Sequence, residues 1–413
     1  MTAFTALLPA AVLLAAATVL PPPATAATDP GASATATPAA PATPAAAIAA
    51  SAPAVAPYVV VLKEAGARAP LRALAAEAAE AGDQVGAVYD TVLDGFAVRT
   101  TAARAAALAA DPRVASVEPD AEFRTSDTQT QTSAPWPLDR IDQRELPLDG
   151  AYAYATKAQG VTAYIVDTGI NTLHQEFGGR ARTGYNALFL EGSADCSGHG
   201  THVAGTVGGA TYGVAKEVSL VAVKVADCRG AGRLSAILKG LEWMVRDAAK
   251  APGTPAVANM SIGGTPSFAL DSAVKRAVRA GITFTVAAGN DASDACAGSP
   301  ARVPQALTVG ATDAGDRRAP FSAYGPCVDL SAPGVAVTSA WKGSRTALAR
   351  ATGTSMAAPH VTGVAALILA SGAAKTPAQV SEVLVRSALR DHVSGLPAGT
   401  PNLLLHLPGG GPA

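Results

Sequence analysis

The second half of the chain alternates short apolar stretches with segments of helical character. The pattern predicts strands at residues 161–166, 218–225, 256–260, 283–287 and 306–309, and helices beginning near residues 199, 234, 268 and 355. Chains that alternate in this way form a mostly parallel sheet, because the crossover between two parallel strands usually contains a helix. We therefore expect an α/β fold with three layers, α/β/α, in which helices cover both faces of the sheet.

The length and composition of the chain allow this domain and a smaller one. The sequence has 413 residues, of which 49% are hydrophobic, and this is ample for a sizeable core. Its formal net charge at pH 7 is −1, and no run of lysine or arginine stands out. Nucleic-acid binding needs a basic surface, so the composition argues against DNA or RNA as a partner.

Three polar residues lie at the edges of these apolar segments. Asp167 ends the first predicted strand, His199 stands between two glycines at the start of a predicted helix, and Ser355 begins the last one. A carboxylate can fix the tautomer of an imidazole, and the imidazole can take a proton from a hydroxyl. The three together predict nucleophilic acyl transfer, with Asp167, His199 and Ser355 as acid, base and nucleophile.

Each of these segments also has a simpler structural interpretation. Asp167, which is followed by Thr and Gly, could begin a turn or cap a helix, and Ser355 could be a helix N-cap. His202 follows His199 by three residues on the same predicted helix, so the two could share a metal ion. The spacing lacks the glutamate of a His-Glu-x-x-His zinc motif, and we interpret His202 as a hydrogen-bonded core residue.

A fourth polar residue, Asn290, follows the strand predicted at residues 283–287. A side-chain amide at a strand end can donate a hydrogen bond to the oxyanion of a tetrahedral intermediate, and the backbone N–H of Ser355 would be the second donor. Asparagine is also common in turns, which is the structural alternative.

The first 57 residues differ in amino-acid composition from the rest of the chain. Residues 1–20 are almost wholly apolar, and a proline run and Ala-Thr-Ala follow, so we interpret residues 1–26 as a secretory signal peptide. Residues 27–57 consist mainly of Ala, Thr and Pro, as in a linker. An uncleaved membrane anchor is the alternative to the signal peptide.

Residues 58–125 show the element order β-α-β-β-α-β, which predicts a small ferredoxin-like α+β domain. The next segment, residues 126–135, begins with a run of Thr, Gln, Ser and Asp and is expected to be an exposed linker open to proteolysis. The remaining residues, 136–413, would form the larger α/β domain.

Four cysteines fit an exported protein. Their number is even, and no Cys-x-x-Cys pair is present, which argues against a zinc ribbon or a thioredoxin-type redox site. Three pairings are possible, and the spacing alone does not choose among them. The cysteines are Cys196, Cys228, Cys296 and Cys327.

Together these motifs resemble the subtilisin-like serine proteases, and within them the proteinase K and aqualysin type. The resemblance covers the chain from about Trp136 to Leu407 and includes the stretches at residues 138–143, 257–264, 308–311 and 321–325. It implies Asp167, His199 and Ser355 as the triad, in the chain order of subtilisin. Residues 58–125 resemble the inhibitory propeptide of this family, which its own enzyme removes.

The resemblance also implies where substrate, disulfides and metal would lie. Extended peptides would pair with Gly230, Ala231 and Gly232 on one side and Ser261, Ile262 and Gly263 on the other, with Ala287, Ala288 and Gly289 lining the pocket for the residue before the scissile bond. The cysteines would pair as Cys196–Cys228 and Cys296–Cys327. A structural calcium ion would bind the carbonyl oxygens of Pro304 and Ala306 and the carboxylate of Asp329, with water completing its shell.

We therefore predict a secreted, monomeric serine endopeptidase, made as a self-processing zymogen and without stable membrane association. Its partners would be protein and peptide substrates and its own propeptide. One alternative is a catalytically inactive, peptide-binding relative that keeps its propeptide. Another, the Ser-Glu-Asp peptidases of the same fold, would need a glutamate where this chain has His199.

Overall fold

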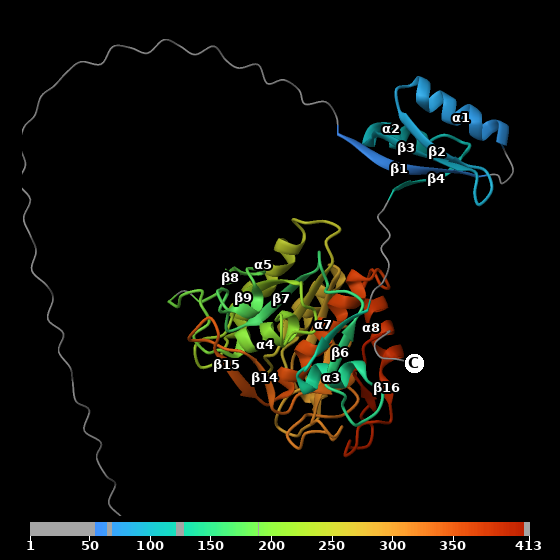
Figure 1. Cartoon of the computed structure of the whole chain (residues 1–413). Coiled ribbons are helices and arrows are strands. Elements are labelled where there is room, and N and C mark those ends of the chain that lie inside the picture. Colours follow the sequence, from blue (N-terminus) through green and yellow to red (C-terminus); the bar gives the residue numbers. More distant parts are fainter. Residues whose placement is uncertain (1–53, 64–67, 121–127, 189, 409–413) are drawn as a thin grey trace, which may run out of the picture. The chain divides into compact units, whose positions relative to one another are not determined.

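The computed structural model describes residues 54–63, 68–120, 128–188 and 190–408 of the chain. The chain divides into two compact units, residues 1–122 and 123–413 (Figure 1). The predicted signal peptide at residues 1–26 lies outside the described residues, as does the predicted linker up to residue 53. Over the described ranges, no helix is long and apolar enough to cross a membrane.

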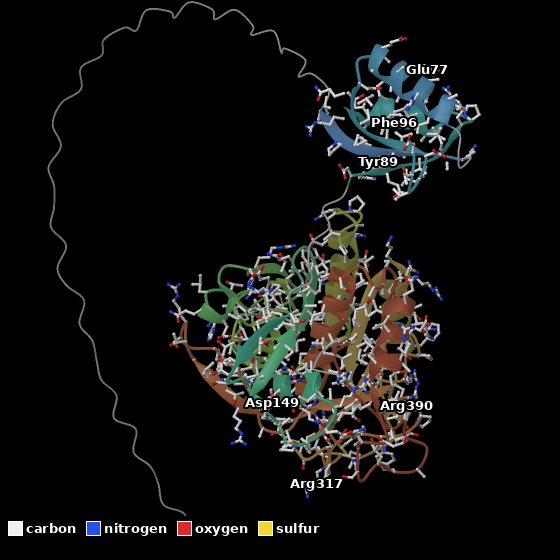
Figure 2. All side chains as sticks on the ribbon, turned by 45° about the vertical axis from the view of Figure 1, so that its right-hand side comes forward. Glu77, Tyr89, Phe96, Asp149, Arg317 and Arg390 are labelled. Atoms are coloured by element: carbon white, nitrogen blue, oxygen red, sulfur yellow. A yellow bond between two sulfur atoms is a disulfide. The ribbon has the colours of Figure 1, made fainter. Side chains whose placement is uncertain are left out.

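The first unit is an antiparallel sheet with two helices, as the order β-α-β-β-α-β predicts. Its strands pair in the order β2-β3-β1-β4. The elements are β1 (Val55–Leu62), α1 (Arg68–Glu80), β2 (Gln84–Tyr89), β3 (Gly95–Thr101), α2 (Ala102–Ala109) and β4 (Val114–Pro119). Phe96 is fully buried in the core, whereas Glu77 lies on the exposed side of α1 (Figure 2).

Strand β1 begins earlier than the sequence indicates. The predicted linker ends at residue 57, but Val55 and Ala56 already pair with Thr101 and Thr100 of β3. The prediction of a linker is therefore wrong for residues 55–57. Backbone hydrogen bonds extend the strand beyond its buried side chains, and the side-chain pattern does not record them.

The second unit contains, within the residues described, a sheet of nine strands in the order β16-β17-β13-β12-β11-β10-β7-β9-β8. Every pairing is parallel except β16 with β17, which confirms the mostly parallel sheet. The strands are β7 (Thr162–Asp167), β8 (Ala181–Asn186), β9 (Ser219–Lys224), β10 (Ala256–Met260), β11 (Ile282–Ala287), β12 (Leu307–Thr312), β13 (Leu330–Pro333), β16 (Leu389–Arg390) and β17 (Leu403–Leu404).

Helices cover both faces of this sheet, as the α/β/α prediction requires (Figure 1). On one face α5 and α6 enclose a core that includes Val166 and Val221, and on the other α4, α7 and α8 enclose a core that includes Ile165 and Leu220. The helices are α3 (Trp136–Asp142), α4 (His199–Gly208), α5 (Leu234–Ala248), α6 (Phe268–Arg279), α7 (Thr354–Ala370) and α8 (Pro377–Ser387).

Among the described residues of this unit, eight strands and two α-helices do not follow from the sequence analysis: β8, β13, β16, β17 and α3, given above, and five further elements. Strands β14 (Val337–Ala340) and β15 (Leu348–Ala351) form a hairpin, and α8 follows the helix expected to be last. Strand β5 (Gln129–Thr132) pairs with β6 (Ala151–Tyr154), so the expected linker at residues 126–135 contains a strand. Its alternating Gln and Thr side chains remain mostly exposed and give no apolar signal.

Helix α7 runs through the interior of the second unit and packs directly against α4. Its residues from Met356 to Ile368 are buried all round, as expected of a helix that is apolar on every face. A Cβ atom at Gly363 would lie 2.5 Å from Cβ of Val214, in the turn that follows α4. It would also lie 3.2 Å from the Val207 carbonyl oxygen of α4, so the glycine allows α7 to approach α4 and the turn after it closely.

We predict that Gly363→Ala lowers the free energy of unfolding by about 1 to 3 kcal/mol, because the added methyl group overpacks the helix contact. The measurement is thermal unfolding followed by circular dichroism. Gly192→Ala is the matched control, since a Cβ at Gly192 meets no atom within 4 Å. Equal melting temperatures for the two variants would contradict the packing argument.

Candidate active site

Asp167 and His199 meet at the carboxyl end of β7. Asp167 is the last residue of this central strand and is fully buried, and His199 is the first residue of α4. Nδ1 of His199 donates to Oδ1 of Asp167 at 2.8 Å. A side chain at Gly200 would collide with the backbone of Gly169, so the glycine allows α4 to start this close to the strand end.

The environment of His199 favours its protonated form. The Asp167 carboxylate raises the pKa of His199 above its ordinary value, burial opposes this, and the hydrogen bond and the more distant Asp195 add to it. The side chain keeps 30% exposure. It lines a cavity of about 300 Å³ together with residues 229–230 and 261–263. An imidazole open on one side and held by a carboxylate on the other can act as a general base.

His202 is the buried core residue that the sequence analysis predicts. It is fully buried, and its Nε2 lies 3.0 Å from the backbone oxygen of Val337. Burial lowers the pKa of His202 to about 4, so the side chain is neutral at neutral pH.

Ser355 lies in the first turn of α7 and faces a second cavity, of about 410 Å³. Its hydroxyl donates to the carbonyl oxygen of Ser261 at 3.2 Å. The two cavities share Ser261 and Gly263 in their linings, so His199 and Ser355 open onto adjoining spaces. Gly353 occupies the N-cap position of α7 without a side-chain hydrogen bond, so the interpretation of Ser355 as an N-cap is wrong.

Asn290 has a fixed amide orientation beside Ser355. Its Oδ1 accepts from the backbone N–H of Thr354 at 2.8 Å and from the Thr354 hydroxyl at 2.9 Å. These bonds leave Nδ2 as the free donor, and among the described residues it has no acceptor. Asn290 and Ser355 line the same cavity, so the amide and the first-turn N–H groups of α7 can serve one oxyanion.

The predicted substrate-binding residues surround these cavities. Ala287, Ala288 and Gly289 line the cavity of Ser355. Gly230 lines that of His199, and Ser261 and Gly263 line both. Gly232 and Ile262 line a further cavity with apolar walls, of about 230 Å³. The Ala231 N–H donates to the Asp227 carboxylate at 2.9 Å, which holds the loop in place.

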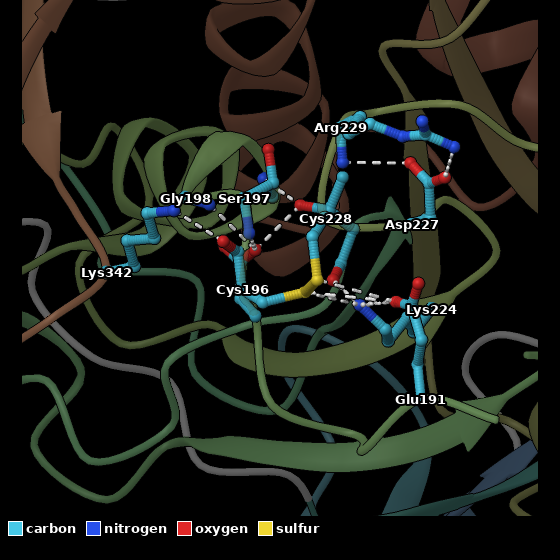
Figure 3. The surroundings of a disulfide bond; sticks show 12 residues. Glu191, Cys196, Ser197, Gly198, Lys224, Asp227, Cys228, Arg229 and Lys342 are labelled. Carbon is cyan, nitrogen blue, oxygen red and sulfur yellow. Dashed lines mark hydrogen bonds and ion pairs between the residues drawn. A yellow bond between two sulfur atoms is a disulfide. The ribbon is translucent and has the colours of Figure 1, made fainter. Parts of the chain in front are cut away.

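Both implied disulfides are present, Cys196–Cys228 and Cys296–Cys327. The first joins the loop before His199 to the segment before Gly230, and Lys224 and Glu191 lie against its sulfur atoms (Figure 3). It therefore ties the candidate base to the candidate substrate-binding loop.

One buried acid beside His199 is absent from the sequence predictions. Asp195 is 7% exposed, and its carboxylate accepts hydrogen bonds from residues on both sides of the Asp167–His199 pair. An Asp placed shortly before a helix start is a capping signal, but the sequence does not show that the same carboxylate also reaches β7.

Two places could hold a metal ion. At the first, implied by the resemblance, Oδ2 of Asp329 accepts from the Thr308 N–H at 2.7 Å. Burial raises the pKa of Asp329 to about 6, and among the described residues it forms no ion pair. Pro304 and Ala306 lie just before β12, whose second residue is Thr308, so their carbonyl oxygens belong to the same neighbourhood.

The second place is an acidic cluster at α3, formed by Asp139, Asp142 and Asp149, which the sequence analysis does not identify. Asp139 and Asp142 are 3% and 4% exposed, and Asp149 on the following loop adds a third carboxylate (Figure 2). Burial, reinforced by the neighbouring acids, raises the pKa of Asp142 to about 7. Asp142 Oδ1 and Gln143 Oε1 are buried without a hydrogen-bond donor among the described residues. Oxygen-rich, negatively charged sites of this kind suit Ca²⁺.

Two family models match this chain. A model of the subtilase family matches residues 158–409, and a model of the peptidase inhibitor I9 family matches residues 57–126. An extracellular serine proteinase of Thermus sp. is 53% identical over 328 residues, covering 79% of this chain and 78% of the relative. Alkaline serine exoprotease A of Vibrio alginolyticus is 47% identical over 330 residues, covering 78% of this chain and 60% of the relative.

A solved structure shows the same relationship. The crystal structure of a cold-adapted subtilisin-like serine proteinase matches with a TM-score of 0.64 at 50% sequence identity. The match covers 67% of this chain and 99% of that chain.

We predict that Asp167→Asn lowers the pKa of His199 by about 1 to 3 units, because an opposite charge in hydrogen-bond contact favours the imidazolium. The measurement is an NMR titration of the histidine ring protons. Glu242→Gln, an exposed charge removal on α5, is the control and is expected to leave the titration unchanged. If the titration of His199 were unaltered in the Asp167 variant, the Asp167 carboxylate would not be the cause of the raised pKa of His199.

Proposed function

Because the chain belongs to the subtilase family of serine proteinases and carries a peptidase inhibitor I9 domain, we propose that it is a secreted endopeptidase, made as a self-processing zymogen. The observation that carries the proposal is the buried Asp167–His199 hydrogen bond next to the Ser355 cavity. Export is supported by the apolar N-terminus, the two disulfides and a relative named as extracellular.

The proposed reaction begins when the Ser355 hydroxyl rotates from the Ser261 carbonyl toward Nε2 of His199. His199 takes the proton while the Ser355 oxygen attacks the peptide carbonyl, and Asp167 stabilises the imidazolium that forms. The imidazolium then protonates the leaving amine, and water releases the acyl group from Ser355 with His199 again as base.

The developing oxyanion would lie between the Asn290 side chain and the start of α7. Nδ2 of Asn290 and the backbone N–H of Ser355 both lack an acceptor among the described residues. Neither donor therefore has to break an existing hydrogen bond before it binds the oxyanion. Preorganised donors of this kind typically lower the barrier by about 3 to 4 kcal/mol each.

The cavities support an extended substrate between residues 230–232 and 261–263. The side chain before the scissile bond would enter the cavity of Ser355, whose walls at Ala287, Ala288 and Gly289 are small. A space of about 410 Å³ with such walls admits a bulky apolar or aromatic side chain.

The first unit would act as the intramolecular inhibitor of the second. The inhibitor match ends at residue 126, and polar residues that are mostly exposed follow at positions 128–133. We place self-cleavage between Arg124 and Ser133, because a protease needs an accessible segment of chain.

We predict that the wild-type precursor loses its N-terminal unit on incubation, whereas Ser355→Ala accumulates at full length. Removal of the hydroxyl deletes the nucleophile without changing the core. Gel electrophoresis and mass spectrometry of the two proteins provide the measurement.

Ser193→Ala, which removes an exposed hydroxyl elsewhere in the unit, is the control and should be processed like the wild type. Equal processing of the wild type and the Ser355 variant would contradict the self-cleavage proposal. A wild-type protein that neither processes itself nor cleaves peptides would favour the inactive, peptide-binding alternative.

We also propose that the enzyme binds structural calcium, at Asp329 with Pro304 and Ala306 and at the acidic cluster of α3. Both places contain partly or fully buried carboxylates. Their pKa values are raised because burial makes the negative charge unfavourable. Arg140 does not neutralise the acidic cluster, because its guanidinium forms a buried ion pair with Asp316. A divalent cation would supply the missing positive charge. At the acidic cluster it would also bind Asp142 Oδ1 and Gln143 Oε1, which have no hydrogen-bond donor among the described residues.

We predict that chelation of calcium lowers the melting temperature of the wild-type enzyme by about 5 to 10 °C, since ligand at a hundredfold excess over Kd stabilises by about 2.7 kcal/mol. Asp142→Asn should melt lower in calcium and respond less to the chelator. Glu382→Gln, on the exposed face of α8, should respond like the wild type. If the melting temperature of the Asp142 variant responded to the chelator as much as that of the wild type, the acidic cluster would not be a calcium site.

A further inference from the structure

Asp195 connects the two elements that carry Asp167 and His199. It lies four residues before His199 and has a buried carboxylate. Five hydrogen bonds end on this carboxylate, and no basic side chain pairs with it among the described residues.

Four of these bonds come from the start of the histidine helix. Oδ1 accepts from the backbone N–H of Ser197 at 3.0 Å and of Gly198 at 2.8 Å. Oδ2 accepts from the N–H of Thr201 at 2.9 Å and from its hydroxyl at 2.5 Å. The carboxylate therefore holds the backbone on both sides of His199, where a helix start leaves N–H groups without partners.

The fifth bond comes from the other half of the site. The hydroxyl of Thr168, the residue after Asp167, donates to Oδ1 of Asp195 at 2.9 Å and accepts from the Gly200 N–H at 2.9 Å. A helix cap alone would need only the first four bonds. The bond to Thr168 fixes α4 relative to the end of β7, and with it the geometry of the Asp167–His199 contact.

Asp195 is also a negative charge close to His199, and it adds to the raised pKa of that residue. Other charges surround the pair on every side. Lys224 donates to the Thr168 carbonyl at 2.7 Å and lies 3.5 Å from Glu191 (Figure 3). Four other charged or titratable groups lie in this neighbourhood. Lys342 donates to the Cys196 carbonyl, and Arg229 lines the cavity of His199. Arg345 lines the cavity beside Asp195, and neutral His202 lies on the next turn of α4.

We propose that Asp195 is a second carboxylate of the catalytic site: a positioning residue that locks Asp167 and His199 together and stabilises the imidazolium formed during proton transfer. The proposal rests on the proposed peptidase function. Asp195 touches neither substrate nor reacting atoms and acts through the backbone around His199, through Thr168, and through its charge.

The test is the pH profile of kcat/KM for a chromogenic peptide in fully processed enzyme, compared between wild type and Asp195→Asn. Loss of the charge lowers the pKa of His199, so the acid limb should move to lower pH by about 0.5 to 1 unit. Loss of the paired bonds should lower kcat by about 10- to 100-fold, with KM little changed.

Two further variants separate position from charge. Thr201→Val and Thr168→Val each remove one neutral hydroxyl that donates to Asp195, so each should lower kcat by a few-fold and leave the acid limb in place. Glu242→Gln removes an exposed charge on α5, away from the site, and it should change neither quantity.

A purely structural role of Asp195 predicts the same loss of activity at every pH, so an unmoved acid limb overturns the electrostatic part of the proposal. Unchanged kcat in both threonine variants overturns the positioning part, and this result can be read even if Asp195→Asn does not fold. An inactive wild type would instead refute the proposed peptidase function.

Discussion

Helices α4 and α7 pack directly against each other, and the relative positions of the candidate residues follow from this contact. His199 begins α4 and Ser355 lies in the first turn of α7, so the packing of the two helices fixes how the proposed base and nucleophile are placed. Glycine at position 363 lets α7 approach Val214, in the turn after α4, and the Val207 carbonyl of α4. Because packed interiors do not deform continuously, this contact can hold the two residues in place more firmly than loops alone would.

The sheet supplies the third group at the same edge. Parallel strands end together on one side, and β7 is an interior strand between β10 and β9, so Asp167 emerges where the helices start. Disulfide Cys196–Cys228 and the Asp195 hydrogen bonds then attach the intervening loop to this edge. Strand order, helix contact and loop attachment each determine one relative position within the site.

The sequence predicts the parallel sheet, the two domains and the candidate catalytic residues, because strand and helix periods are local and the chemical groups follow strand ends. It does not predict β5, whose polar side chains give no buried pattern although its backbone pairs with β6. It also misses Asp195 and the acidic cluster around Asp142. Both depend on contacts between segments that are distant in the chain, or on burial that a single side chain does not reveal.

The two carboxylates beside His199 differ in how the protein solvates them. Asp195 accepts five hydrogen bonds, so its charge is stabilised whatever the state of the imidazole. Asp167 accepts from His199 and from the Thr168 N–H through Oδ1, and its buried Oδ2 has no donor among the described residues. A poorly solvated carboxylate gains most from a neighbouring cation. In the proposed mechanism Asp167 therefore responds to proton transfer, and Asp195 keeps the surrounding geometry constant.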